Sequence, residues 1–168
     1  MILDPRPRIP VLSPMRLQRF LRPDLVLTDL QGSDVQDVIH RISLHLEAEG
    51  AVASRAEVEK GLLSREEAHS TAMGHGMALP HATIQGLPEP VLMVALAPEP
   101  VQFGPPDTDP VRVFFVLLSP PGHEGEHIKL LARICRLVRH PGFIEDLQGA
   151  EDGNAAVEVI ERIDELHV

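Results

Sequence analysis

A single cysteine, Cys135, occurs in the 168 residues of this sequence. One thiol cannot form a disulfide within the chain, and it cannot supply the several sulfur ligands of a cysteine-based metal centre. The scarcity of cysteine therefore argues against a disulfide-stabilised secreted scaffold and predicts a protein of the reducing cytoplasm.

Long apolar stretches are also missing. No run reaches the ~20 residues that a helix needs to cross a bilayer, which predicts that the chain does not insert into a membrane. The first 14 residues contain four prolines and lack the apolar centre of a signal peptide. We therefore expect residues 1–15 to be a disordered leader or a start-site artefact, with Met15 as an alternative start, and residues 16–168 to form the domain.

Basic residues are in the minority, because 15 Lys and Arg face 25 Asp and Glu, a net charge of -10. This balance argues against nucleic acid or an anionic membrane surface as a partner. The glycine-rich loops that hold nucleotides, of the Walker type or the pattern G-x-G-x-x-G, are absent from the sequence as well. Binding of ATP or a dinucleotide cofactor thus has no support in the sequence.

What the sequence does contain is 43% hydrophobic residues, enough for the core of one domain. Residues 90–96 and 111–118 are near-continuous apolar runs of strand length, which is typical of strands buried on both faces. Residues 25–27 indicate a further short strand or an extended entry into the fold. The proline-rich, acidic residues 98–110 are expected to form a surface loop or hairpin connection.

Helix signals flank these runs. Two capping boxes, in which a serine precedes Gln or Glu by three residues, predict two successive amphipathic helices. They begin at Ser33 and Ser54, and they end at Gly50 and near His69.

Three more helices are expected after the apolar runs, and together the elements predict a fold. Pro141 would start a short helix between the two longer ones. The inward apolar positions are Ile128, Leu131, Ile134, Cys135 and Val138 in the first of them and Val157, Ile160, Ile163 and Leu166 in the last. The sequence thus predicts a single domain of the α/β class, of the α+β sandwich type, with a mixed β-sheet flanked by helices.

The stretch from Gly74 to His81 reads Gly-His-Gly-Met-Ala-Leu-Pro-His. Its two glycines allow turn geometries closed to other residues, and the apolar run that follows predicts a buried strand edge. Pro80 fixes the backbone just before the imidazole of His81, a placement that presents the ring for chemistry. A structural histidine after an X-Pro turn is the alternative for His81 taken in isolation.

Continued by residues 82–87, this stretch resembles the phosphorylation-site signature of the enzyme IIA domains of the bacterial sugar phosphotransferase system (PTS), fructose/mannitol type (type 2). The similarity extends from about Leu17 to the C-terminus, and it is strongest to the nitrogen-regulatory members. The family pattern has Asn at the position of His75 and commonly a basic residue at the position of Thr83. These departures concern the fine tuning of the site.

The resemblance implies a set of site residues. His81 would be phosphorylated, His127 would stabilise the phosphoryl group as a second imidazole, and Arg65 would contact its oxygens. Gly76 and His75 would lie beside the bound group. Three alternatives stay open: a solvated helix-start residue for His127, an exposed helix arginine for Arg65, and a turn residue replacing Asn for His75, since both types tolerate positive φ.

The resemblance also implies a function, that of a cytoplasmic phosphohistidine carrier without cofactor or metal. The carrier would accept the phosphoryl group from an HPr-like phosphocarrier protein. It would pass the group to an enzyme IIB in a sugar relay, or control a regulatory target protein in nitrogen or other metabolic regulation.

A second function class rests on the residues His123-Glu124-Gly125-Glu126-His127, which spell H-E-x-x-H. In zinc peptidases this spacing places two histidine ligands one helical turn apart, with the glutamate as general base. A zinc-dependent hydrolase is therefore the alternative. Gly125 within the motif, its place at a helix start after residues 120–122, and the lack of an evident third ligand disfavour it.

Overall fold

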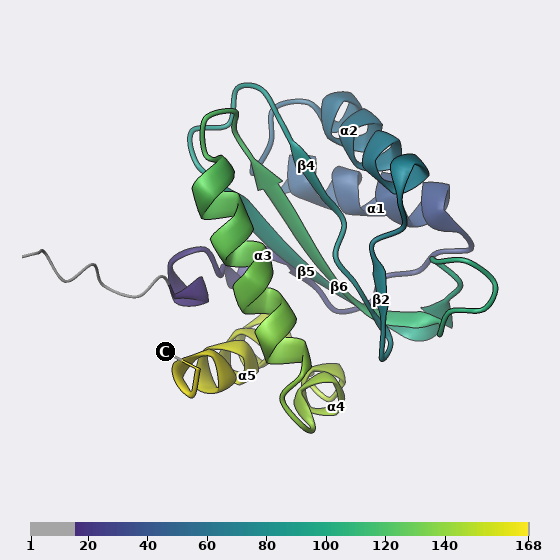
Figure 1. Ribbon diagram of the computed structural model, residues 1–168, viewed down its shortest axis with the longest axis vertical. Coiled ribbons are helices and arrows are strands. Elements are labelled where there is room, and N and C mark those ends of the chain that lie inside the picture. The colour runs from purple at the N-terminus through teal and green to yellow at the C-terminus, as the bar shows by residue number, and fades with distance from the viewer. Residues whose placement is uncertain (1–15, 168) are drawn as a thin grey trace, which may run out of the picture.

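The computed structural model describes residues 16–167, which form one mixed β-sheet between two layers of helices (Figure 1). The predicted leader, residues 1–15, lies outside the described residues. The expected fold class is confirmed. The helices are η1 (Leu17–Arg19), η2 (Pro23–Leu25), α1 (Val35–Ala48), α2 (Arg55–Ala68), α3 (Glu124–Val138), α4 (Phe143–Gln148) and α5 (Gly153–Glu165). The strands are β1 (Val26–Leu27), β2 (Ala72–Gly74), β3 (Met77–Ala78), β4 (His81–Thr83), β5 (Val91–Val101) and β6 (Val111–Ser119).

The sheet is built around the antiparallel pair of β5 and β6. Its order is β1-β5-β6-β3-β2, and β4 also pairs with β6, beyond the end of β3. Both β3 and β4 run parallel to β6, so Met77 lies opposite Val113 and His81 lies opposite Leu117. The consequence is that His81 sits near the carboxyl end of the central strand.

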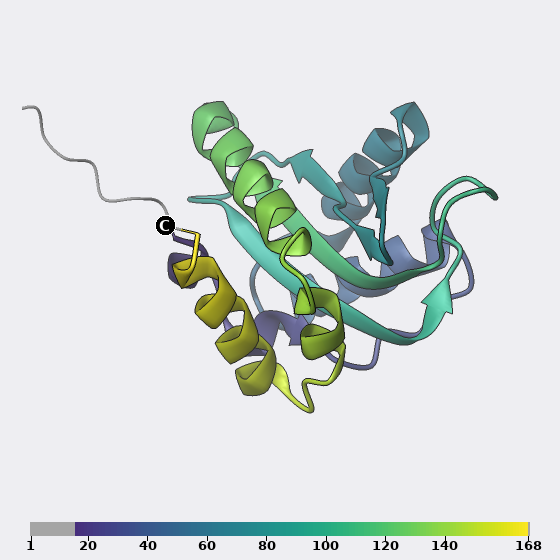
Figure 2. The same cartoon turned by 60° about the horizontal axis from the view of Figure 1, so that its bottom comes forward.

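The two faces of the sheet carry separate apolar cores, as expected for strands buried on both sides. Because successive strand residues point to opposite faces, Phe115 and Leu117 pack toward α3, α4 and α5. Phe114 and Val116 pack toward α1 and α2. Figure 2 shows the two helical layers on either side of the sheet.

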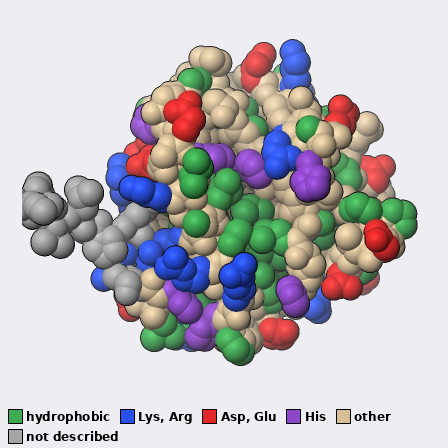
Figure 3. Space-filling view, viewed as in Figure 1, with side chains coloured by type: hydrophobic (Ala, Val, Ile, Leu, Met, Phe, Trp, Pro, Cys, Tyr) green, Lys and Arg blue, Asp and Glu red, His purple; other side chains and the backbone are tan. Residues whose placement is uncertain are grey.

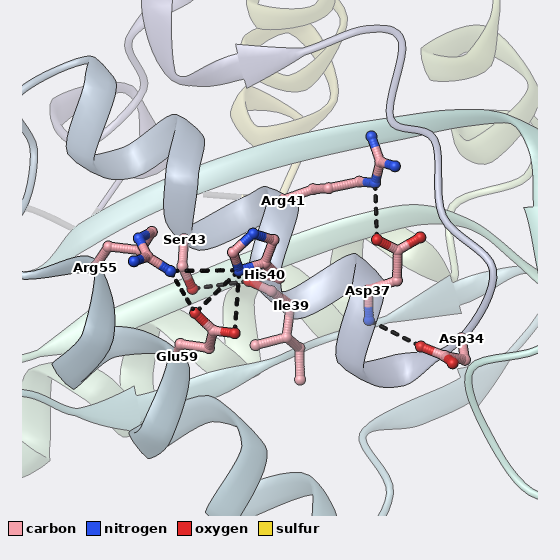
Figure 4. Close-up of polar contacts among 8 residues, drawn as sticks. All are labelled: Asp34, Asp37, Ile39, His40, Arg41, Ser43, Arg55 and Glu59. Atoms are coloured by element: carbon pink, nitrogen blue, oxygen red, sulfur yellow. Dashed lines mark hydrogen bonds and ion pairs between the residues drawn. The ribbon is translucent and has the colours of Figure 1, made fainter.

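The predicted start of α2 at Ser54 is confirmed, because the Ser54 side chain accepts a hydrogen bond from the amide of Glu57. The predicted start of α1 at Ser33 is wrong by one residue. Asp34 is the cap and accepts from the amide of Asp37 (Figure 4). The carboxylate of Asp37 in turn accepts from the amide of Ser33. A carboxylate offers the same cap as a hydroxyl and also favours the positive helix end, so Asp34 takes the role.

A cluster of polar side chains joins α1 to α2 on the outside of their layer. The ring Nδ1 of His40 lies 3.2 Å from both carboxylate oxygens of Glu59. Arg55, one helical turn before Glu59, donates to the same carboxylate at 3.1 Å (Figure 4). These contacts hold the two helices side by side.

Strand β5 is longer than predicted, because it continues through Pro98 and Pro100 to Val101. The prolines are tolerated here for a physical reason. On its outer side β5 pairs with β1 only as far as Ala95, and past that point a residue without an N–H removes no ladder hydrogen bond. The loop is therefore confined to residues 102–110.

The expected inward stripe of α3 is confirmed in part, because Ile134 is buried and Leu131, Cys135 and Val138 are partly buried against the same core. The side chains that face the core are Leu130, Ile134 and Leu137, together with the nearly buried Arg133, and Ile128 is 65% exposed. Arg133 lies on the inward face because its guanidinium donates to the buried carboxylate of Asp164 on α5. An ion pair between two helices leaves no trace in the spacing of apolar residues. The apolar pattern of α3 therefore could not place Arg133 on the inward face.

Two smaller predictions about the C-terminal helices also need correction. The short helix α4 begins at Phe143, after a left-handed Gly142, and not at Pro141. Leu166 caps the end of α5 and is 66% exposed, because the helix that buries the rest of its stripe ends at Glu165. No helix within residues 16–167 combines the length and the apolar character that crossing a membrane requires.

Candidate active site

His81 is the first residue of β4, and the backbone on both sides of it is tied to β6. The amide of Leu117 donates to the carbonyl of Pro80 at 3.0 Å, and the amide of Ile84 donates to the carbonyl of Ser119 at 2.9 Å. The half-buried ring of His81 has its Nδ1 2.8 Å from the carbonyl oxygen of Leu79. A carbonyl can only accept, so Nδ1 carries the hydrogen and the free lone pair of the neutral ring is on Nε2.

His127 faces this ring from the first turn of α3, and its own ring is likewise half-buried. The two ring centroids are 5.5 Å apart with an interplanar angle of 53°. The sequence separates these residues by 46 positions, and the expected closeness is confirmed. Burial lowers the pKa of His127, and the neighbouring His81 lowers that pKa further, so His127 is neutral at pH 7.

Ser119, the last residue of β6, contacts the second of these two histidines. Its hydroxyl oxygen lies 2.6 Å from Nδ1 of His127, and the serine is only 2% exposed. Ser119 is not among the site residues predicted from the sequence. The only signal was its place at the carboxyl end of an apolar strand, where polar residues commonly face a site.

Arg65 lies on the helix that packs along β4. Gly61, one turn earlier on the same face of α2, is so close to β4 that a Cβ there would lie 3.4 Å from the Cβ of Ala82. The guanidinium of Arg65 donates to the carbonyl of His69 at 2.8 Å. This hydrogen bond closes the end of α2, so the helix brings Arg65 alongside β4 while the guanidinium itself is engaged at the helix terminus.

The structure does not bring His75 and Gly76 to this pair, which corrects their placement beside the phosphoryl group. They are the two central residues of the β2–β3 hairpin, with φ of 56° and 82°. Positive φ at both positions is the signature of a type I′ turn, for which Asn and Gly are preferred. Gly76 lies opposite Arg112, five residues from Leu117 along β6 and hence roughly 16 Å from the level of His81.

The histidines of the H-E-x-x-H sequence engage separate partners. Nδ1 of His123 lies 3.4 Å from the carboxylate of Glu126, whereas Nδ1 of His127 is at Ser119. The carboxylate of Glu124 accepts from the amide of Gly122, which lowers the pKa of Glu124. Among residues 16–167 no three His, Cys, Asp or Glu side chains converge on a common point as metal ligands would. The geometry therefore gives the hydrolase alternative no support.

An exposed apolar surface adjoins the two histidines, between α3 and β2. We call it the α3–β2 patch; its exposed members are Met73 and Ile128, and its half-buried members, which also pack against the core, are Leu131, Cys135 and Val138. Ile128 is 65% and Met73 43% exposed, and the Cys135 sulfur lies 4.0 Å from that of Met73. Figure 3 shows apolar side chains gathered on this face below a row of histidines and basic side chains. One edge of the stripe predicted to face the core thus borders this surface.

Comparison with known proteins assigns the fold and the family. Residues 19–163 match the family described as phosphoenolpyruvate-dependent sugar phosphotransferase system, EIIA 2. The chain is 30% identical over 146 residues to a nitrogen regulatory protein of Bradyrhizobium diazoefficiens, a match that covers 87% of this chain and 95% of that protein. The resemblance noted in the sequence is thereby confirmed.

Solved structures agree with this assignment. The nitrogen regulatory protein IIA-Ntr from Neisseria meningitidis superimposes with a TM-score of 0.78 at 26% identity, covering 86% of this chain and 98% of that one. The mannitol enzyme IIA of Escherichia coli, solved in complex with its phosphorylated enzyme IIB, gives 0.71 at 20% identity and covers 83% and 96%. At that lower identity the likeness shows the fold alone.

Members of this family are phosphotransferase components that carry phosphoryl groups between proteins, in sugar transport or in nitrogen regulation. The predicted class of function is therefore confirmed, and none of the relatives described above is a zinc hydrolase. Because the family match spans most of the chain, this protein belongs to the EIIA 2 family of the phosphoenolpyruvate-dependent sugar phosphotransferase system.

Proposed function

We propose that Nε2 of His81 accepts the phosphoryl group. The observation that carries this proposal is the hydrogen bond from Nδ1 of His81 to the carbonyl of Leu79, which leaves Nε2 as the nucleophilic nitrogen of a half-buried ring. The short distance to the ring of His127 supports it, because a second imidazole can then meet the incoming oxygens.

The donor is a phosphohistidine on an HPr-like phosphocarrier protein. The Nε2 lone pair of His81 attacks the phosphorus in line as the N–P bond of the donor breaks, and the donor imidazole leaves with that electron pair. One N–P bond forms and one breaks, so the transfer is close to thermoneutral and reversible. The protein contributes position and electrostatics, and the step requires no metal.

His127 stabilises the transferred group through its ring N–H. A phosphoryl group brings about -1.5 to -2 charges, by analogy with other phosphorylated side chains. Placed on His81, that charge raises the pKa of the neighbouring His127 and favours its protonation, so the second ring becomes a cationic partner. Reversal of the transfer releases that proton again.

Arg65 is the third proposed contact. Its place on α2, one turn beyond Gly61, where an added Cβ would contact Ala82 of β4, supports a reach toward the phosphoryl oxygens. To do so, its guanidinium must exchange the carbonyl of His69 for a stronger anionic acceptor. The phosphoryl group would provide that acceptor.

The partner proteins dock on the α3–β2 patch. An apolar surface beside a reactive histidine suits a partner that must exclude water during transfer, and the exposed Ile128 is its most prominent side chain. The complex of the mannitol enzyme IIA with phosphorylated enzyme IIB supports an enzyme IIB as one acceptor. The nitrogen regulatory relatives support a regulatory target as the other. Since such a relay is fed by phosphoenolpyruvate, we propose a cytoplasmic location.

The proposal is tested by incubating the protein with phosphoenolpyruvate, a purified enzyme I and HPr, and measuring the intact mass. The wild type should gain one acid-labile phosphoryl group and His81→Ala none. His123→Ala is the matched control, since His123 lies at the start of the same helix as His127, and it should be labelled like the wild type. Undiminished labelling of His81→Ala would place the acceptor elsewhere. Stoichiometric zinc lost in His123→Ala would favour the hydrolase.

A further inference from the structure

Ser119 is held rigidly at the end of the central strand. It pairs in parallel register with Thr83 of β4, and its carbonyl accepts from the amide of Ile84. Only 2% of its surface is exposed, and its hydroxyl lies 2.6 Å from Nδ1 of His127. The backbone that fixes β4, and thus His81, therefore also fixes the hydroxyl that touches His127.

The chemistry of this contact decides which way the hydrogen bond runs. The hydroxyl of Ser119 makes no other hydrogen bond within residues 16–167, and no side-chain polar atom buried there is left without a partner. A buried O–H must donate to avoid the cost of an unsatisfied donor, and Nδ1 is the acceptor within reach. The neutral ring of His127 must then carry its proton on Nε2.

We propose that Ser119 is a positioning residue, whose hydroxyl holds the ring of His127 in the tautomer that presents Nε2–H to a phosphoryl group on His81. This inference rests on the proposed function of His81. The rings are 5.5 Å apart, so a phosphoryl group bound to one of them lies within reach of the other. Ser119 itself touches neither the phosphoryl group nor His81.

A hydroxyl suits this position because it can both donate and accept. When His127 is neutral, the Ser119 hydroxyl donates to Nδ1. When the phosphorylated state protonates His127, Nδ1 becomes a donor and the hydroxyl rotates to accept from it. The burial that lowers the pKa of the unphosphorylated ring makes the neutral form the resting state. The ring thus keeps one orientation through the whole transfer cycle.

A double-mutant cycle tests the inference, with the rate of phosphoryl transfer to the protein as readout. Ser119→Ala should slow transfer about tenfold, the scale set by one lost hydrogen bond. In a His127→Ala background the same change should cost nothing further, because Ser119 acts only through His127. Ser119→Thr retains the hydroxyl and should restore the rate.

Ser43→Ala is the matched control for loss of a buried hydroxyl. Ser43 is fully buried and donates to the carbonyl of Ile39 within α1, where Figure 4 shows it (2.8 Å). This variant should transfer phosphate at the wild-type rate. Ring ¹⁵N chemical shifts of the unphosphorylated protein give an independent readout, and they should place the proton of His127 on Nε2.

Two results would overturn the inference: an equal loss from Ser119→Ala in both backgrounds, or a proton on Nδ1 of His127 in the wild type. Failure of the wild type to accept phosphate on His81 would instead sink the proposed function. In that case the ¹⁵N shifts still decide the role of Ser119, because they need no phosphoryl group.

Discussion

At the scale of single residues, two hydrogen bonds divide the roles of two similar rings. Leu79 accepts from Nδ1 of His81, and Ser119 meets Nδ1 of His127. In the proposed mechanism each contact leaves an Nε2 atom for chemistry, one as nucleophile and one as hydrogen-bond donor. Identical side chains are thus assigned different functions by the groups that contact their Nδ1 atoms.

The first consequence is a protonation change that accompanies phosphorylation. Burial lowers the pKa of His127 below its ordinary 6.5 in the free protein, so the ring is neutral at pH 7. Phosphorylation of His81 should raise that pKa, because the negative charge is added to a ring whose centroid lies 5.5 Å from that of His127. NMR titration of both forms measures the shift. Identical titration of His127 in both forms would contradict the proposed stabilising role.

The same shift gives stability a pH dependence of known sign. Below pH 6.5 the unfolded chain binds a proton at His127 that the folded, unphosphorylated protein resists. The free energy of unfolding therefore decreases as the pH falls through this region. Above this region His127 is neutral in both states and causes no loss of stability. In the phosphorylated protein, where the pKa of His127 rises, this decrease should weaken or reverse.

At the scale of elements, the β2–β3 hairpin is a turn that lies away from the two facing histidines. The family resemblance implied that His75 and Gly76 lie beside the phosphoryl group. Their geometry is instead that of a type I′ turn, at a level of β6 distant from that of His81. His75 is the only residue other than glycine with positive φ in the described chain. Left-handed backbone at such a residue stores strain of about 1–3 kcal/mol, less at Asn.

Replacing His75 by a residue that tolerates positive φ should therefore stabilise the protein without changing phosphoryl transfer. His75→Asn is expected to raise the free energy of unfolding by roughly 0.5–1 kcal/mol, because Asn adopts the left-handed region more readily. His75→Val should lower it, since a β-branched side chain is least compatible with positive φ. Denaturant unfolding measures both changes. A fall in phosphoryl transfer with His75→Asn would instead return this residue to the site.

The hairpin and α3 also mark the limits of what the sequence could predict. The strand runs, the five α-helices and the two facing histidines followed from periodicity, caps and a family signature. Arg133 could not be placed inward from its type alone, because its burial depends on Asp164, 31 residues away. Ser119 could not be predicted for a related reason, since its role depends on a contact with His127 on another element.

At the scale of the whole molecule, the site lies where a reactive pair meets an exposed apolar surface. The chain carries a net charge of -10, yet the α3–β2 patch is uncharged. Such a surface favours docking by burial of apolar area, which varies little with salt compared with charge pairing. A carrier that must meet a donor and an acceptor in turn can use one such surface for both.

A charge placed on the patch should therefore weaken docking and leave the chemistry intact. Ile128→Glu is expected to raise the KM for the phosphorylated donor about tenfold with little change in kcat, since it removes uniform binding. Leu166→Glu is the matched control, because Leu166 is equally exposed, at 66%, beyond the end of α5. Steady-state transfer kinetics distinguish the two. An equal effect of both variants would contradict the docking surface.

The buried carboxylate of Asp164 has a further consequence, for the order in which the chain can fold as it is made. One of its oxygens accepts from Arg133 and the other from the amide of Leu17, 147 residues away. During synthesis Leu17 leaves the ribosome early, and its acceptor emerges only when α5 is nearly finished. The segment before β1 can therefore make this hydrogen bond only after α5 has been synthesised. The contact joins the beginning of the described fold to its end.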